Sequence, residues 1–452
     1  MNFTFPEIFV VSSIVCLMAF ECVSSIRSRS WVEVYRPTLF ITIILAFYVL
    51  LGPLRAIFST GEAPNFVGTS GTVYRMFEHR QLLIYGWAAA LVFYASVLFG
   101  FHFVRIGFKR PRIFPDLDLN KARRLGQVLC LIALSVHAII KIQLFLTSVE
   151  INPDHVLYSF LLPIFRYNDF TFASYLVFLS DLFVPGVLLQ ISVWLRRREK
   201  TPALLFWIII STVLFVNQGF RYKLFMLYAP ALLLWLFYVK KRPKLVLGTL
   251  LIISSIAVSG AVSVWRSEAR GSSIDNSSLS PIEVIISGFE EAGTFFTSSL
   301  VISLVPSTYN YIGLEPIVTT LLQPFPRSLL PNKPPGDYTY RIQDRIYSTQ
   351  GELTWKSHTA FLGFVEYYLI AGWTSLVAIS IAIGSMLKSL WSWFLLRQHE
   401  PIAQTIYLLN ACYLYSIISR GYLPQVIMGY CGIVLPVYLV YRWLASRSRL
   451  SC

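Results

Sequence analysis

The residues of this sequence whose types could do chemistry are carboxylates set in or beside apolar runs. Glu290 and Glu291 interrupt an otherwise apolar stretch, and Glu366 lies in the apolar segment GFVEYYLIAGW. Apolar surroundings raise the pKa of a carboxylate, and a raised pKa suits a general base working near neutral pH. We therefore interpret these three residues as catalytic candidates. The alternative for each is an ion pair with a nearby Arg.

A second group consists of cations between, or at the ends of, apolar runs. An Arg guanidinium can pair with two phosphate oxygens at once, so convergence of such residues would create a site for phosphate or pyrophosphate. The alternative is that they reach out to lipid headgroups or pair with loop carboxylates. The candidates for pyrophosphate binding are Arg221, Lys223, Arg266, Arg327 and Arg420.

The other polar and aromatic signals are weaker. Tyr338, Tyr340 and Trp355 could stack on sugar rings, or could belong to the aromatic belt of a membrane interface. Asp181 and Lys141 fall at similar depth in neighbouring apolar runs, and we expect them to form a structural ion pair. The scattered cysteines predict no metal site, the chain has no Walker A loop, and we expect no cofactor.

The elements that must position these residues follow from composition. Of the 452 residues, 56% are hydrophobic and 13% charged, whereas soluble domains carry about 25% charged residues. The apolar runs approach the length of about 20 residues that crosses a bilayer as a helix, and only helices or closed barrels pair all backbone groups in lipid. The sequence predicts an all-α, polytopic membrane protein of about eleven helices, over 6–25, 37–54, 82–104, 125–147, 173–195, 203–217, 224–239, 245–265, 359–387, 401–418 and 424–441.

The loops between these runs alternate in charge. Most Lys and Arg fall in one alternate set of short loops and in the C-terminal tail, which the positive-inside rule places in the cytoplasm. The N-terminus is then outside and the C-terminus inside. The Lys and Arg residues of these cytoplasmic loops account for the net charge of +15, so we expect no nucleic-acid partner.

The predicted organisation has three parts. Residues 1–265 hold helices 1 to 8, residues 266–358 form a large periplasmic loop, and residues 359–452 hold helices 9 to 11. That loop is far longer than an ordinary connection. Its apolar stretch 284–305 predicts a re-entrant or interfacial helix, and the Pro-rich stretch 316–335 predicts a loop on the membrane surface.

Four local stretches resemble one family. QGFRYKLFMLYAP resembles an Arg-bearing hairpin of helices, and GFEEAGTFF resembles an acidic stretch. FPRSLLPNKP resembles a Pro-Arg motif, and SHTAFLGFVEYYLIAGW resembles the end of the large loop. The family is that of the bacterial oligosaccharide repeat-unit polymerases, the O-antigen polymerases of the Wzy class. The Gln-Gly before Arg221 departs from the small residues expected there.

The resemblance implies a membrane glycosyltransferase with a GT-C-like fold, acting in O-antigen or exopolysaccharide synthesis for lipopolysaccharide and related glycans. It would transfer a glycan from undecaprenyl pyrophosphate to a sugar hydroxyl of another lipid-linked unit, at the periplasmic face of the cytoplasmic membrane. Arg327, Arg221 and Arg420 would stabilise the leaving pyrophosphate, and Glu290 or Glu291, in preference to Glu366, would accept the hydroxyl proton. A chain-length regulator and a flippase are the implied protein partners.

Three other functions remain open from the sequence. An O-antigen ligase uses the same donor and places a His in the large loop, where His358 is the candidate. A flippase or other transporter would place charges deep in the bundle and show inverted repeats. A non-enzymatic subunit of a polysaccharide complex would make the outer Arg and Glu residues matter only for stability.

Overall fold

The computed structural model describes the residues 4–28, 30–53, 80–104, 118–151, 178–199, 202–218, 221–239, 293–325, 329–334, 336, 338–342 and 360–450. These ranges contain helices and no strand. Six helical stretches are long and apolar enough to cross a membrane: Phe5–Arg27, Leu83–Phe103, Leu119–Ile142, Trp373–Leu395, Pro401–Ser419 and Leu423–Ser446. The predicted all-α class is confirmed, and the long apolar helices are those of a polytopic membrane protein.

The helices of these six stretches are α1 (Phe5–Arg27), α5 (Leu83–Phe103), α6 (Leu119–Ile151), α18 (Trp373–Leu395) and α19 (Pro401–Ser419), with α20 (Leu423–Ile433) and α21 (Leu435–Leu450) forming the last stretch together. Shorter helices are α2 (Pro37–Leu45, continued by η2, Ala46–Leu51), α9 (Phe183–Arg197), α10 (Pro202–Gln218), α11 (Arg221–Tyr238), α14 (Thr294–Leu304), α15 (Glu315–Leu322) and α17 (Gly363–Ala371). Short 3-10 turns are η1 (Trp31–Tyr35), η3 (Arg80–Leu82) and η6 (Ser180–Leu182). The predicted span 245–265 lies outside the described residues.

The prediction of one helix over 359–387 is wrong. The chain breaks at Gly372, where φ is +72°, so that α17 ends before α18 begins. A Cβ at this position would lie 2.6 Å from the Tyr311 hydroxyl oxygen, so both the backbone angle and the close contact require glycine. With nine residues, α17 spans about 14 Å, which is too short to cross a bilayer.

The apolar stretch 284–305 is described from Gly293 onward, where it forms α14. This helix has eleven residues and packs against α5 and α17, with most of its side chains buried. Its polar Ser298 side chain accepts a hydrogen bond from the backbone N–H of Leu362, 2.9 Å away, at the start of α17. With eleven residues, α14 is too short to cross the hydrocarbon core of a bilayer.

The chain packs as two compact units built from separated stretches. Unit 1 comprises Met1–Phe108, Phe289–Ser392 and Leu414–Ile427, and unit 2 comprises Lys109–Gly288, Trp393–Tyr413 and Met428–Cys452. Each unit therefore combines chain from both sides of the large loop. Division along the sequence into 1–265, 266–358 and 359–452 describes the connectivity of the chain but not these packing units.

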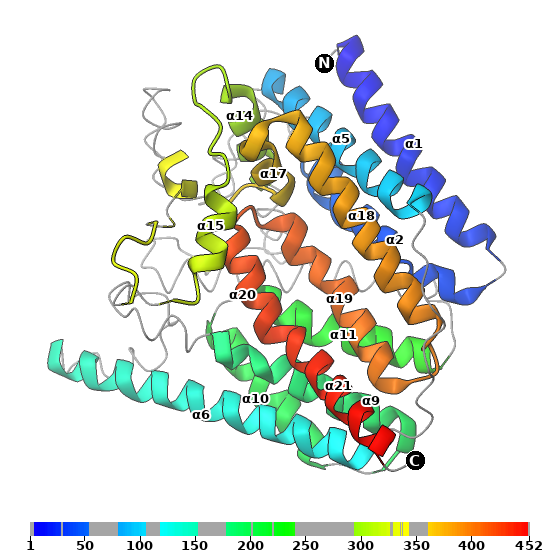
Figure 1. Cartoon of the computed structure of the whole chain (residues 1–452), viewed down its shortest axis with the longest axis vertical. Helices are drawn as coiled ribbons and strands as arrows, with labels where there is room; N and C mark the ends of the chain where they lie inside the picture. Colours follow the sequence, from blue (N-terminus) through cyan, green and yellow to red (C-terminus); the bar gives the residue numbers. More distant parts are fainter. Residues whose placement is uncertain are drawn as a thin grey trace, which may run out of the picture. The chain divides into compact units, whose positions relative to one another are not determined.

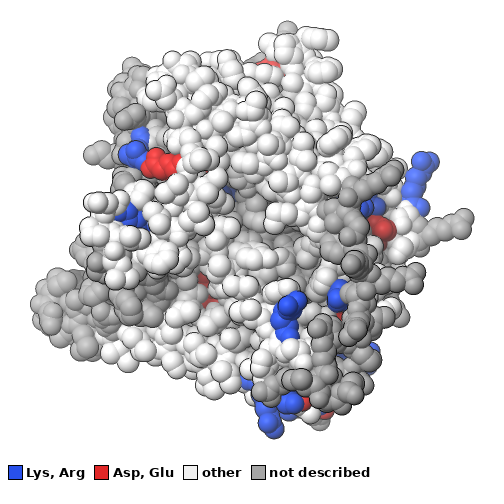
Figure 2. All heavy atoms as spheres, viewed as in Figure 1, with Lys and Arg blue, Asp and Glu red and all other residues white. Residues whose placement is uncertain are grey.

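In unit 1, helices α1, α5 and α18 run in the same direction, with α14 and α17 beside the N-terminal ends of α5 and α18 (Figure 1). Near the other ends of α5 and α18, the Lys388 ammonium lies 5.1 Å from the centre of the Phe101 ring. In unit 2, α6 packs along α9, and α9 also contacts α10 and α11. Uncharged side chains dominate the face drawn in Figure 2, where Lys and Arg gather in a few small groups.

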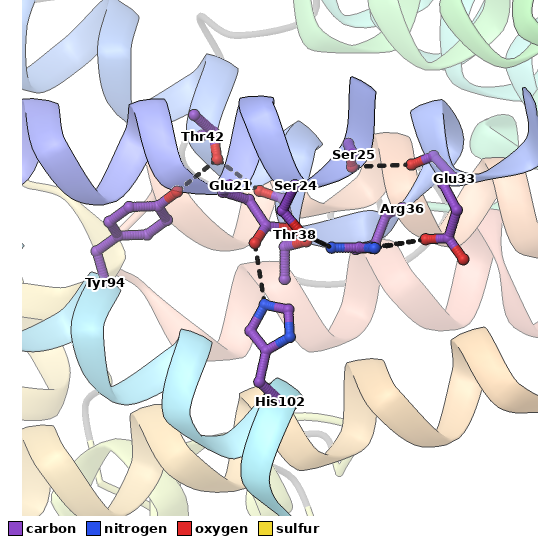
Figure 3. Close-up of polar contacts among 9 residues, drawn as sticks. All are labelled: Glu21, Ser24, Ser25, Glu33, Arg36, Thr38, Thr42, Tyr94 and His102. Carbon is purple, nitrogen blue, oxygen red and sulfur yellow. Dashed lines mark hydrogen bonds and ion pairs between the residues drawn. The ribbon is translucent and has the colours of Figure 1, made fainter. Parts of the chain in front are cut away.

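A buried carboxylate, Glu21, ties α1 to α2 and α5 in unit 1 (Figure 3). Arg36 Nη1 and His102 Nε2 lie 3.1 Å and 2.9 Å from its two oxygens, and the Thr38 hydroxyl donates to Oε1. Arg36 also contacts Glu33 at 2.6 Å. Each charge in this network has a partner, as burial requires.

We expect Glu21→Ala to destabilise the protein by about 3 kcal/mol, because Arg36, Thr38 and His102 lose their shared acceptor. The measurement is the unfolding temperature of the purified protein in one detergent. The matched control is Cys16→Ala, which alters an exposed position of the same helix. Equal unfolding temperatures for the two variants would contradict the stabilising role of Glu21.

Candidate functional site around Glu366

The candidate site begins with the close approach of α17 to α19. A Cβ at Gly363 would lie 2.1 Å from the backbone oxygen of Ile417, so only glycine permits this contact. The backbone N–H of Gly421 donates to the Phe361 carbonyl oxygen at 2.7 Å. These contacts bring the first turn of α17, which contains Glu366, against the turn between α19 and α20.

The Glu366 carboxylate accepts two hydrogen bonds on one oxygen. The Leu423 backbone N–H donates to Oε1 at 3.0 Å, and the Tyr338 hydroxyl donates to the same oxygen. Leu423 is the first residue of α20, where the N–H groups have no acceptor within the helix. A carboxylate at this position satisfies one of them and also interacts favourably with the helix dipole.

Contacts from the large loop hold Tyr338 over Glu366. The Tyr422 hydroxyl donates to the Gly336 carbonyl oxygen at 2.9 Å, and the rings of Tyr338 and Tyr422 have centroids 5.5 Å apart. Arg341, on the same short helical segment 338–342, pairs with Glu315 at the start of α15. The contacts at Gly336 and Arg341 therefore hold the chain on both sides of Tyr338.

The environment raises the pKa of both partners. Burial raises the pKa of Glu366 to about 7, although the hydrogen bonds from Tyr338 and Leu423 favour its charged form. Burial, and then the neighbouring Glu366, raise the pKa of Tyr338 well above its ordinary value. Glu366 can thus gain or lose a proton near neutral pH, which is the property required of a general acid or base.

Four of the predicted site residues lie together in unit 1. Glu366 and Tyr338 are each 1% exposed and hydrogen-bonded to each other. Tyr340 is exposed on the segment that holds Tyr338. Arg420 is partly exposed in the turn between α19 and α20, two residues before Tyr422. Glu366 and Tyr338 are thus in contact, and Arg420 and Tyr340 belong to the two segments that hold them.

The other predicted site residues are not part of this group. Those in unit 2 are Arg221, the first residue of α11, whose side chain lies outside the described part, and Lys223. Lys223 is fully buried, and its Nζ lies 2.6 Å from Asp181 Oδ1 and 5.8 Å from the centre of the Phe215 ring. The residues outside the described ranges are Arg266, Glu290, Glu291, Arg327, Trp355 and His358.

The ion pair of Asp181 differs from the sequence expectation. We expected Lys141 as its partner, and the pair that forms is with Lys223 of α11. Lys141 and His137, one turn apart on α6, are also buried in unit 2. Among the described residues, no group of three or more His, Cys, Asp or Glu side chains could hold a metal ion.

The sequence did not predict that the Leu423 backbone N–H donates to Glu366, or that the Tyr422 hydroxyl donates to the Gly336 carbonyl oxygen. The signal that could have suggested them is the segment RGYLP, where glycine and proline mark a tight connection between two apolar runs. It also missed Glu21, a carboxylate inside the first predicted span, where such residues are costly and need partners.

Comparisons of this chain with protein-family models, with curated proteins and with solved structures find no match.

We expect Tyr338→Phe to raise the pKa of Glu366 above about 7, because the lost hydrogen bond favoured the charged carboxylate. Infrared spectra of the parent protein and of Tyr338→Phe would be recorded over a range of pH, and the spectrum of the same protein carrying Glu366→Gln would be subtracted from each. The difference isolates the carboxyl band of Glu366 and gives its titration midpoint. The contribution of Glu366 to stability should be fully present below about pH 4.5 and should be lost as pH rises through about 7, since the folded-state pKa is the higher one. An unchanged midpoint in Tyr338→Phe would contradict this assignment. Tyr340→Phe, which alters the exposed neighbour, is the control.

Proposed function

We propose that this protein is a membrane glycosyltransferase that polymerises lipid-linked oligosaccharide repeat units. The observation on which the proposal rests most is the buried Glu366 carboxylate, which Tyr338 and the Leu423 N–H hold beside the turn that contains Arg420. Glu366 also lies in the last of the four stretches that resemble the Wzy-class polymerases. The proposal includes about eleven spanning helices, a GT-C-like arrangement and a site facing the periplasm of a bacterial cytoplasmic membrane.

The proposed reaction breaks the bond between a glycan and undecaprenyl pyrophosphate. The bond that forms joins the anomeric carbon to a hydroxyl oxygen of a second lipid-linked unit, and the bonding electrons leave with the pyrophosphate. Arg420, with Arg327 as a further candidate, would stabilise the charge on the leaving group. Glu366, with Glu290 and Glu291 as the other candidates, would accept the hydroxyl proton.

The occlusion of Glu366 sets a condition on this mechanism. Because Tyr338 occupies one oxygen of the carboxylate and both side chains are buried, an acceptor hydroxyl can reach that oxygen only if Tyr338 moves aside. The exposed Tyr340 and the candidate Trp355 would bind sugar rings of the substrate. A chain-length regulator and a flippase remain the proposed protein partners.

The test is polymerisation of an undecaprenyl-pyrophosphate-linked repeat unit by the purified protein in lipid nanodiscs, with products resolved on a gel. We expect Glu366→Gln and Arg420→Ala each to lower the rate about 100-fold, because each removes a group needed in the transition state. Arg442→Ala, which removes an exposed cation from α21, is the matched control. Full activity in both site variants would exclude them from catalysis.

The same proposal predicts the phenotype of a deletion strain. Its surface glycan should collapse from a ladder to single repeat units, and the wild-type gene should restore the ladder. An unchanged ladder would exclude polymerisation. Accumulation of lipid-linked polymer without surface glycan would favour a ligase or a transporter.

A second function, ion-coupled transport, is favoured by the buried charges of unit 2. Asp181 and Lys223 form a fully buried ion pair, and His137 and Lys141 are buried in the same unit. Ionisable residues inside a membrane bundle often belong to substrate or proton pathways. The alternative is that the ion pair only stabilises the fold. A double substitution distinguishes this structural role from a role in transport.

We expect Lys223→Met alone to destabilise the protein by about 3 kcal/mol, since it leaves the Asp181 carboxylate buried without its cation. The double variant Asp181→Asn, Lys223→Met should recover most of this stability, because neither charge remains. Stability is measured by thermal unfolding, and polymerisation by the nanodisc assay. A stable double variant with intact polymerisation indicates a structural pair. Loss of proton-driven uptake of a lipid-linked oligosaccharide into proteoliposomes by that variant would instead support transport.

A further inference from the structure

The helix α15 exposes a continuous apolar stripe. Leu314, directly before the helix, is 63% exposed, and Leu321, two turns later, is 67% exposed. Ile317 and Val318 lie between them and are also exposed. Spacings of three, four and seven residues place these side chains on one face, because each helical residue turns by about 100°.

The opposite face of α15 packs against the protein. Pro316 and Thr319 are buried, and α15 contacts α17. A Cβ at Gly336 would lie 3.3 Å from Cγ2 of Thr319, so the backbone at Gly336 passes close to this buried face. The exposed face of α15 is therefore more apolar than the face that packs against the protein.

The segment after α15 extends the same stripe. Phe325 and Leu329 are largely exposed, and Lys333 donates hydrogen bonds from Nζ to the carbonyl oxygens of Gln323 and Phe325, both at 3.1 Å. These bonds fold the segment 329–334 back toward the end of α15. The ammonium group of Lys333 also adds a positive charge beside the stripe.

We propose that this stripe, formed by Leu314, Ile317, Val318, Leu321, Phe325 and Leu329, lies in the interfacial layer of the bilayer, in contact with the upper acyl chains of lipids. In water such a row of large exposed side chains would cost about 25 cal/mol for each Å² of apolar surface. The long apolar helices of the same chain bring a bilayer to it. With eight residues, α15 spans about 12 Å, too short to cross the hydrocarbon core.

The surrounding polar groups fit an interfacial position rather than a deeper one. Arg341 pairs with Glu315 at one end of α15, and Lys333 lies at the other. Tyr311, four residues before Glu315, is exposed. Tyrosine is enriched at the level of lipid headgroups, and cations beside an apolar face bind the anionic headgroups.

This contact has a structural consequence for the segment that covers Glu366. Glu315, at the start of α15, pairs with Arg341, and Arg341 shares the segment 338–342 with Tyr338. A bilayer that fixes α15 therefore also fixes one anchor of the Tyr338 segment. The contact itself does not depend on the reaction proposed for the site, and its test needs no activity.

The test places an environment-sensitive NBD fluorophore on single cysteines of the full chain in vesicles of phosphatidylethanolamine and phosphatidylglycerol. Cys130 and Cys412 stay because they are buried, and the four other cysteines are replaced by serine. The labelled positions are Leu314→Cys and Leu321→Cys, with Asn310→Cys as the exposed polar control four residues before Leu314. Lipids with a nitroxide near the top or near the end of the acyl chain report depth.

We expect blue-shifted emission at positions 314 and 321, with stronger quenching by the shallow nitroxide than by the deep one, and neither effect at 310. Emission at 314 and 321 equal to that at 310 would overturn the proposal, because the stripe would then face water. Blue-shifted emission without quenching by either lipid would also overturn it, since protein would then cover the stripe. Stronger quenching by the deep nitroxide would place α15 inside the hydrocarbon core and would exclude the interfacial position.

Discussion

A helix that begins inside a protein leaves peptide N–H groups without acceptors, and much of unit 1 follows from how α20 meets this requirement. The Glu366 carboxylate accepts from the first N–H group of α20 at Leu423. The close approach of α17 to α19, which brings Glu366 to this position, requires Gly363. The burial of this carboxylate therefore depends on the contact between α17 and α19.

Three buried carboxylates among the described residues, Glu21, Asp181 and Glu366, differ in what surrounds them. Glu21 faces Arg36, and Asp181 faces Lys223, so each has a cation within 3.1 Å. Glu366, in contrast, has two neutral hydrogen-bond donors among the described residues, Tyr338 and the Leu423 N–H. Burial raises the pKa of Glu366 to about 7, although both donors favour its charged form. This raised pKa makes Glu366 a group suited to proton transfer.

The large loop contributes to unit 1 through α14, α15 and the segment 336–342. Its polar contacts cover Glu366 from one side, through Tyr338 and the clamp between Tyr422 and Gly336. Its apolar stripe on α15 points away from the protein. A loop that is anchored on its inner face and apolar on its outer face couples the cover of the site to the lipid beside it, through the pair Arg341 and Glu315.

The sequence alone predicted the long apolar helices that correspond to 6–25, 82–104, 125–147, 401–418 and 424–441, because a run of about 20 apolar residues has one stable state in lipid and this property is local. It also identified Glu366 and Tyr338 as notable residues, each from its own surroundings in the chain. Only the tertiary structure decided that these two meet, that Asp181 pairs with Lys223, and that 359–387 contains two helices. Partners 28 and 42 residues apart along the chain, and a break that depends on the contact between Gly372 and Tyr311, are set by packing between helices, which hydrophobic periodicity does not encode.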